Sequence, residues 1–179
     1  MRYLDRLIAK RIREGDVQAF EGLMVDFQAR LFSYCIRMTN DYHAAEDLTQ
    51  EIFIKVFKNI GLYDETKAAL STWIYTICRR TCLNYLRDYG REPYQPIHED
   101  PMGAGGTGKD PYKFLEDRLL LIRALNELDP EDREMVILKD YLDLKYREIG
   151  RILILPTGTV KSRIHSIRTR LRLVLKGGE

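Results

Sequence analysis

The segment Tyr146–Leu175 has the sequence YREIGRILILPTGTVKSRIHSIRTRLRLVL, and its pattern predicts two helices joined by a tight turn before Pro156. In the second predicted helix, five apolar residues recur at spacings of four, three, four and three. This spacing gathers them into one stripe, which must face a core. They are Val160, Ile164, Ile167, Leu171 and Val174.

The opposite side of this second helix is polar and basic. Short polar side chains lie in the middle of the face and cations at its edges. A helix that enters the DNA major groove needs this distribution, because short side chains reach base edges while Lys and Arg meet phosphates. The pattern favours a helix-turn-helix over the alternative, a basic helix whose polar face is only solvated. The polar residues are Thr159, Ser162, His165, Ser166 and Thr169, and the flanking cations are Lys161, Arg163, Arg168, Arg170 and Arg172.

Charge is distributed unevenly along the 179 residues. Residues 145–179 hold nine Lys or Arg against two acidic residues, although the net charge of the whole chain is only +2. A basic C-terminal end on a mildly acidic body favours a phosphate backbone as the partner of one end and a protein as the partner of the other. No apolar run approaches the roughly 18 residues of a membrane helix, so we expect a cytoplasmic protein without membrane insertion.

The chemistry-bearing residues predict neither a metal site nor catalysis. The three cysteines, Cys35, Cys78 and Cys82, are an odd number, which favours a reducing compartment. Cys78 and Cys82 lie four apart on an apolar helix face, and we interpret them as small buried hydrophobes because no Cys or His at nearby spacing completes a zinc site. Without a nucleophile motif, a phosphate-binding loop or paired catalytic carboxylates, the sequence predicts no cofactor and no enzymatic activity.

Helical periodicity also dominates the first half of the chain. Asp16 is the expected N-cap of a long core helix that ends near Asn40, and a second helix follows. Residues 61–70, GLYDETKAAL, lose the period and predict a loop. Ser71 is the expected N-cap of a further helix that runs to about Tyr89.

The helix that follows this loop carries a second unusual face, with Trp73, Arg80, Asn84 and Arg87 on one side. One interpretation is a tryptophan that covers a neighbouring helix, with charges at its edge. The other is a platform on which bases stack against the aromatic ring while phosphates meet the guanidinium groups, as single-strand binders require.

Residues 92–111 lose all periodicity and contain four of the six prolines, which predicts a flexible linker. The fold class is therefore all-α, with two small helical domains at residues 1–91 and 112–179. Asp129 and Pro130 predict a capped helix start within the second domain, which ends in the helix-turn-helix.

Three segments together resemble the small, two-domain extracytoplasmic-function group of bacterial RNA polymerase sigma factors. Ala45–Phe57, AEDLTQEIFIKVF, is similar to the family segment that docks on the clamp helices of the polymerase β′ subunit. Ser71–Arg87, STWIYTICRRTCLNYLR, resembles the segment that melts and reads the promoter minus-ten element. Tyr146–Leu171 resembles the reader of the minus-thirty-five element. The resemblance covers nearly the whole chain.

The resemblance implies partners and roles residue by residue. The partners are core RNA polymerase, through its β′ clamp helices and β flap, promoter DNA and an anti-sigma factor. The loop at 61–70 is expected to receive a flipped non-template base. The implied polymerase-binding residues are Asp47, Gln50 and Glu51; the minus-ten residues are Tyr63, Lys67, Trp73, Arg80, Asn84 and Arg87; and the minus-thirty-five residues are Thr159, Lys161, Ser162, Arg163, His165 and Ser166.

Two positions depart from the family pattern. Asparagine is common in the family where this chain has Arg80, which predicts a phosphate contact or a changed base preference there. The family tends to place glycine in the turn of the helix-turn-helix, where this chain has Ile154, so we expect a turn that is either reshaped or strained.

Two functions of other classes compete with a sigma factor. The first is a helix-turn-helix transcriptional regulator with an N-terminal sensing or dimerisation domain, which predicts a ligand pocket or a dimer interface in residues 1–90. The second is an enzyme acting on nucleic acid, which would need a metal-binding carboxylate cluster that the sequence does not contain.

Overall fold

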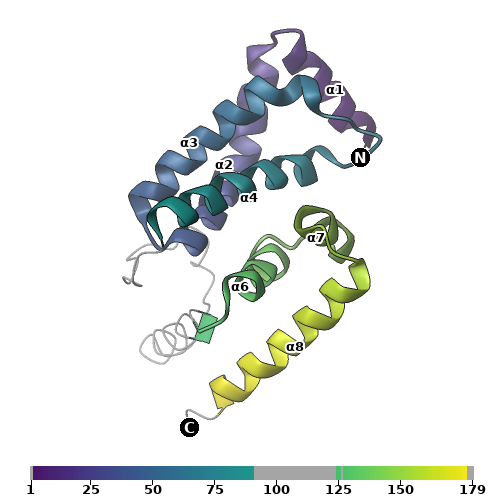
Figure 1. Ribbon diagram of the computed structural model, residues 1–179. Coiled ribbons are helices and arrows are strands. Elements are labelled where there is room, and N and C mark those ends of the chain that lie inside the picture. The colour runs from purple at the N-terminus through teal and green to yellow at the C-terminus, as the bar shows by residue number, and fades with distance from the viewer. Residues whose placement is uncertain (1, 91–123, 126, 177–179) are drawn as a thin grey trace, which may run out of the picture. The chain divides into compact units, whose positions relative to one another are not determined.

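The computed structural model describes residues 2–90, 124–125 and 127–176, which form helices and turns and no strand (Figure 1). The chain divides into two compact units, Met1–Pro93 and Tyr94–Glu179. These observations confirm the prediction of an all-α fold with two domains. The predicted linker at 92–111 lies outside the described residues. No helix in the described ranges is long and apolar enough to cross a membrane.

The first unit is built from four helices and one short 3-10 turn. Capping side chains set the helix boundaries: Asp16 accepts a hydrogen bond from the backbone N–H of Ala19 at 3.0 Å, and Asp41 accepts one from Ala44 at 3.0 Å. The cap at Asp16 confirms the predicted helix start. Asn40 takes a left-handed conformation between the two helices. The elements are α1 (Arg2–Arg13), α2 (Val17–Thr39), α3 (Tyr42–Asn59), η1 (Ile60–Leu62) and α4 (Leu70–Tyr89).

The core of this unit lies between α2, α3 and α4. Apolar side chains from each helix are fully buried there, among them Leu31 of α2, Ile52 of α3 and Ile74 of α4. Each such side chain contributes about 1.5–3 kcal/mol through burial alone. The core therefore fixes which faces of α3 and α4 remain outside.

The predicted N-cap at Ser71 is wrong. The residue before α4 is Ala69, whose side chain cannot cap, so the free N–H groups of the first turn need another acceptor. The carboxylate of Asp5 supplies one, accepting a hydrogen bond from the backbone N–H of Leu70 at 3.1 Å. Figure 1 shows α1 running beside the segment that joins α3 to α4. A helix distant in sequence therefore caps α4.

The second unit contains a short helix, a π-helical turn and the two helices of the predicted motif. Asp129 accepts a hydrogen bond from the backbone N–H of Asp132 at 3.0 Å, and Pro130 occupies the first turn, as predicted. The interior includes Met135, Leu138 and Ile149. The elements are α6 (Pro130–Val136), η2 (Ile137–Tyr141), α7 (Tyr146–Leu153) and α8 (Thr157–Lys176).

Candidate functional site

Helices α7 and α8 form the predicted helix-turn-helix. Four of the five residues assigned to the apolar stripe of α8 are buried, and the side chain of the fifth, Val174, lies outside the described residues. The buried stripe fixes the rotation of α8 about its own axis, so the opposite face points to solvent. The four residues are Val160, Ile164, Ile167 and Leu171.

The turn between the two helices keeps a left-handed residue without glycine. Ile154 has φ 59° and ψ 45°, and its side chain is 83% exposed. The carbonyl of Gly150 accepts a hydrogen bond from the backbone N–H of Leu155 at 2.8 Å, which closes the turn. Of the two expected outcomes, the turn is strained rather than reshaped, because a β-branched residue in this region costs roughly 1–2 kcal/mol.

The outward face of α8 presents short polar side chains, as predicted. Ser162 donates a hydrogen bond from Oγ to the backbone carbonyl of Thr159 at 3.0 Å. Five of the six predicted minus-thirty-five residues are exposed on this face: Thr159, Lys161, Ser162, His165 and Ser166.

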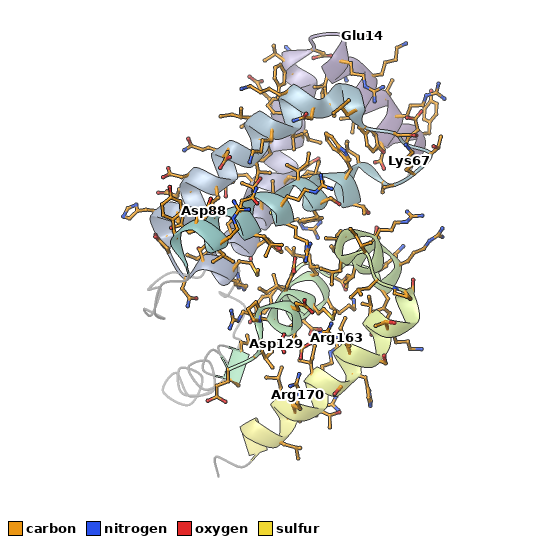
Figure 2. The ribbon with its side chains drawn as sticks, viewed as in Figure 1. Glu14, Lys67, Asp88, Asp129, Arg163 and Arg170 are labelled. Carbon is orange, nitrogen blue, oxygen red and sulfur yellow. The ribbon has the colours of Figure 1, made fainter. Side chains whose placement is uncertain are left out.

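Arg163, the sixth predicted residue, lies at the edge of the face and pairs with α6. Its Nη2 donates to Oδ1 of Asp132 at 2.8 Å, and its Nη1 donates to Oε2 of Glu131 at 3.1 Å. The hydrogen bond to Asp132 raises the pKa of Arg163. Arg170 contacts the second carboxylate oxygen of Asp132, whose side chain is only 8% exposed. Figure 2 shows Arg163 and Arg170 on the side of α8 nearest α6.

The internal ion pairs divide the cations of α8 into two groups. Arg168 pairs with Asp140 of η2, so three of the five edge cations contact carboxylates of their own domain. Within the described part of the chain, Lys161 and Arg172 are exposed and have no acidic partner. The periodicity of α8 could not distinguish the paired cations from the unpaired ones, because the acidic partners lie on α6 and η2.

Specific side-chain contacts hold the segment between α3 and α4. Tyr63 is only 4% exposed, donates a hydrogen bond from its hydroxyl to the carbonyl of Ala68 at 3.1 Å, and lies with its ring centroid 5.5 Å from that of Trp73. Lys67 is exposed and pairs with Asp64 at 3.3 Å. Of the two predicted minus-ten residues in this segment, Lys67 is thus accessible and Tyr63 supports the Trp73 ring from inside.

Helix α1 holds this segment from the side. Arg13 donates from Nε to the carbonyl of Ile60 at 3.0 Å and from Nη2 to the carbonyl of Tyr63 at 2.5 Å. Asp5 caps Leu70 at the other end. Together Arg13 and Asp5 fix both ends of the segment, and we call these two residues the α1 clasp. No sequence signal identified the clasp, because its contacts span 47 to 65 residues.

The remaining predicted minus-ten residues share one face of α4. Trp73 is half-buried, whereas Arg80, Asn84 and Arg87 are exposed at successive turns. Arg87 pairs with Asp88 at 2.9 Å, and this contact raises the pKa of Arg87. The Trp73 ring packs on Tyr63 while the side chain remains partly accessible, and its stacking role stays a prediction.

The three predicted polymerase-binding residues, Asp47, Gln50 and Glu51, are all exposed on α3. Glu51 pairs with Lys55 at 2.6 Å. Beside Gln50, an apolar groove of about 390 Å³ opens between α2 and α3. Sequence spacing did not predict this groove, whose lining includes the half-exposed Ile54 and Phe57. The groove is lined by Phe20, Met24, Gln28, Thr49, Gln50, Phe53, Ile54, Phe57 and Lys58.

Comparisons with known families match both domains. The family model for sigma-70 region 2 matches residues 23–92, and the model for sigma-70 region 4 matches residues 118–171. The ECF RNA polymerase sigma factor SigW of Bacillus subtilis is 32% identical, over 97% of this chain and 99% of its own. The ECF RNA polymerase sigma-E factor of Escherichia coli K12 is 33% identical, over 92% of this chain and 90% of its own.

Two solved structures have a similar fold. CnrH, solved in complex with the cytosolic domain of CnrY, superposes with a TM-score of 0.75 at 19% identity, over 98% of this chain and 99% of that chain. The sigma factor RpoE, solved in complex with the anti-sigma factor NepR from Bartonella quintana, gives a TM-score of 0.70 at 25% identity, over 89% of this chain and 98% of that chain.

Proposed function

Because this chain belongs to the extracytoplasmic-function sigma factors of bacterial RNA polymerase, we propose that its two domains divide promoter recognition between duplex and single-stranded DNA. The C-terminal domain reads the minus-thirty-five duplex with the outward face of α8. The N-terminal domain docks on core polymerase through α3 and captures the opened minus-ten strand along α4. Catalysis of RNA synthesis stays with the polymerase, and the chain acts in the cytoplasm.

One observation carries this proposal: an exposed polar and basic helix face and an aromatic–cationic helix face occur in separate domains of one chain. The outward face of α8 is fixed by its buried stripe and offers side chains that suit base edges. The α4 face offers the Trp73 ring and two exposed arginines, Arg80 and Arg87, which suit stacked bases and phosphates. A duplex reader joined to a single-strand reader fits promoter opening.

The order of the segment before α4 supports base capture. An extruded base loses a few kcal/mol of stacking and pairing, which a preformed pocket can recover. The α1 clasp and the buried Tyr63 hold the segment in place before DNA arrives. We therefore assign to Tyr63 a supporting role beneath Trp73, and to Lys67 a contact with the strand.

Core polymerase is the proposed partner of the exposed polar residues of α3. Asp47 and Gln50 extend into solvent, and the apolar groove beside Gln50 adds contact area of the kind that a protein partner buries. We also propose that an anti-sigma factor restrains this chain, as the complex of RpoE with NepR suggests for a relative.

A regulator with an N-terminal sensing domain is the weaker candidate. Residues 23–92 match sigma-70 region 2, and a sensing domain leaves the α4 face without a role. Binding to core polymerase distinguishes the two functions. A sigma factor binds the core enzyme in place of another sigma factor, whereas a regulator of that class does not.

Gel filtration with core polymerase from the same organism tests the docking surface. We expect the purified protein to co-elute with the core, and we expect Asp47→Lys to weaken the complex at least tenfold. Asp26→Lys, which makes the same charge change at an exposed position of α2, is the matched control. Equal retention of both variants contradicts the assignment of Asp47, and absence of any complex contradicts the proposed function.

A further inference from the structure

Three cysteine side chains meet inside the N-terminal domain. Cys35 comes from α2, and Cys78 and Cys82 come from successive turns of α4. All three are fully buried, at 0% exposure. Their sulfur atoms lie within 4.8 Å of one another, with 3.4 Å between Cys35 and Cys82. Sequence spacing does not reveal this cluster, because Cys35 lies 43 residues before Cys78.

The three sulfur atoms form one compact buried cluster, with one side chain from α2 and two from α4. A cation that accepts sulfur ligands would replace the protons of these thiols.

We propose that Cys35, Cys78 and Cys82 form a three-coordinate binding site for a soft, thiophilic metal ion of the Cu(I) class. Thiolates select soft ions over hard ones. Metal–sulfur bonds of about 2.3 Å place three sulfurs in a plane roughly 4.0 Å apart. The 3.4 Å between the sulfurs of Cys35 and Cys82 lies below this value, and all three sulfurs lie within 4.8 Å of one another.

The number of ligands selects the ion. A structural zinc site takes four protein ligands, and catalytic zinc keeps a water in the fourth position. Among the described residues, no fourth Cys, His, Asp or Glu joins the cluster, and full burial excludes bulk water from it. A three-sulfur site without water suits Cu(I), which stays in the same oxidation state on binding. Each thiol that becomes a thiolate ligand releases one proton.

Occupancy of this site would join α2 to α4 through the metal. An ion that binds only the folded state stabilises it according to its concentration relative to its dissociation constant. The N-terminal domain would therefore unfold at a higher temperature in the presence of Cu(I). This inference does not depend on the proposed role in transcription.

Anaerobic titration of the full chain with Cu(I), in the presence of a phosphine reductant, tests the site. We expect one Cu(I) per chain, a sulfur-to-copper charge-transfer band, the luminescence typical of water-shielded Cu(I) thiolates and a rise in melting temperature. Cu(I) is added both to the folded protein and during refolding, because the buried site opens only when α2 and α4 separate. Less than half an equivalent bound under both conditions overturns the proposal.

Single substitutions establish the ligand set. We expect Cys35→Ala, Cys78→Ala and Cys82→Ala each to lose the luminescence and to bind Cu(I) at least a hundredfold more weakly. Ile74→Val is the matched control, because it removes one methyl group from a fully buried position one turn before Cys78 and leaves all three thiols. Unchanged binding in any of the three alanine variants overturns the site as described.

X-ray absorption of the copper-loaded wild-type chain needs no variant and remains decisive if the alanine variants do not fold. Three sulfur ligands at one distance support the site. Two sulfur ligands, or any nitrogen or oxygen ligand, overturn it.

Discussion

The carboxylate of Asp5 accepts a hydrogen bond from the backbone N–H of Leu70, 65 residues further along the chain. Through this contact α1 caps α4, the helix whose outer face carries Trp73. The region 2 family model begins at residue 23, so α1 lies outside the match. A helix beyond the family match thus holds the segment that we assign to base capture.

Arg13→Ala should loosen that segment and impair promoter opening. The substitution removes two hydrogen bonds to backbone carbonyls, at Ile60 and Tyr63, and we expect it to destabilise the N-terminal domain by about 1–3 kcal/mol. Faster amide hydrogen exchange in residues 61–70 and weaker permanganate footprints of the open bubble are the expected readouts.

Lys10→Ala is the control for Arg13, because Lys10 lies on the same helix and pairs only with the exposed Glu14 among the described residues. We expect the control to match wild type in both assays. Wild-type exchange and footprints in Arg13→Ala would show that α1 does not support the segment.

Trp73→Ala should impair strand opening more than it impairs binding to core polymerase. Stacking of a base on an aromatic ring contributes about 1–3 kcal/mol, so bubble formation should fall by roughly fivefold to a hundredfold. Permanganate footprinting measures the bubble, and co-elution measures polymerase binding.

Trp73→Phe keeps an aromatic surface and should recover much of the footprint. Because Trp73 also packs on Tyr63, thermal unfolding of each variant must be measured alongside. Footprints unaffected by Trp73→Ala would contradict the stacking role.

Lys161→Ala should weaken minus-thirty-five binding without changing stability. Lys161 is exposed on α8 and has no acidic partner in the described part of the chain. Loss of one phosphate contact should reduce the slope of log binding constant against log salt concentration by roughly 1. Fluorescence anisotropy on a minus-thirty-five duplex at several salt concentrations measures this slope, and an unchanged slope contradicts the contact.

Arg163→Ala should lower both DNA binding and stability. The substitution leaves the buried carboxylate of Asp132 with Arg170 as its cationic partner, and we expect a loss of about 1–3 kcal/mol in the free energy of unfolding.

Asp132→Asn separates the two effects of Arg163, because it weakens the same ion pair while retaining the arginine. If Arg163 contacts phosphate, Asp132→Asn should destabilise the domain yet bind DNA more tightly than Arg163→Ala does. Equal affinities would show that Arg163 acts only through domain stability.

Ile154→Gly should stabilise the C-terminal domain by about 1 kcal/mol. Glycine removes the left-handed strain at φ 59°, and its greater freedom in the unfolded state offsets part of the gain. Thermal unfolding measures the shift. A lower melting temperature for Ile154→Gly would contradict the assigned strain.

Gly150→Ala provides the opposite case in the same turn. A Cβ atom at Gly150 would lie 2.7 Å from the carbonyl oxygen of Leu155, so this variant should unfold at a lower temperature.

Periodicity was sufficient to predict α2, α3, α4, α7 and α8, with the buried side of α8, because a buried stripe needs only residues of one helix. It did not predict α1 (Arg2–Arg13) as a helix. The caps at Asp16 and Asp129 were predictable for the same reason, since the acceptor and donor lie three residues apart. Ser71 failed as a cap because α4 begins one residue earlier, at Leu70, and the N–H of Leu70 bonds to Asp5, which no local pattern reveals.

Contacts between residues of different helices could not be predicted in the candidate sites either. The pairing of Arg163 with Asp132 spans 31 residues, and the approach of Cys35 to Cys82 spans 47. Residue types and spacing on α8 and α4 predicted which faces are outward, whereas the partners that restrain those faces follow from tertiary packing. The assigned contacts with DNA and polymerase stay predictions.

Run-off transcription with core polymerase from the same organism tests the central claim most directly. Core enzyme with the purified chain should yield a discrete transcript from a cognate promoter, identified by start-site mapping with and without the protein, and the transcript should disappear when the minus-thirty-five element is scrambled. Core enzyme that gives the same transcripts with and without the chain would contradict its function as a promoter-specificity factor.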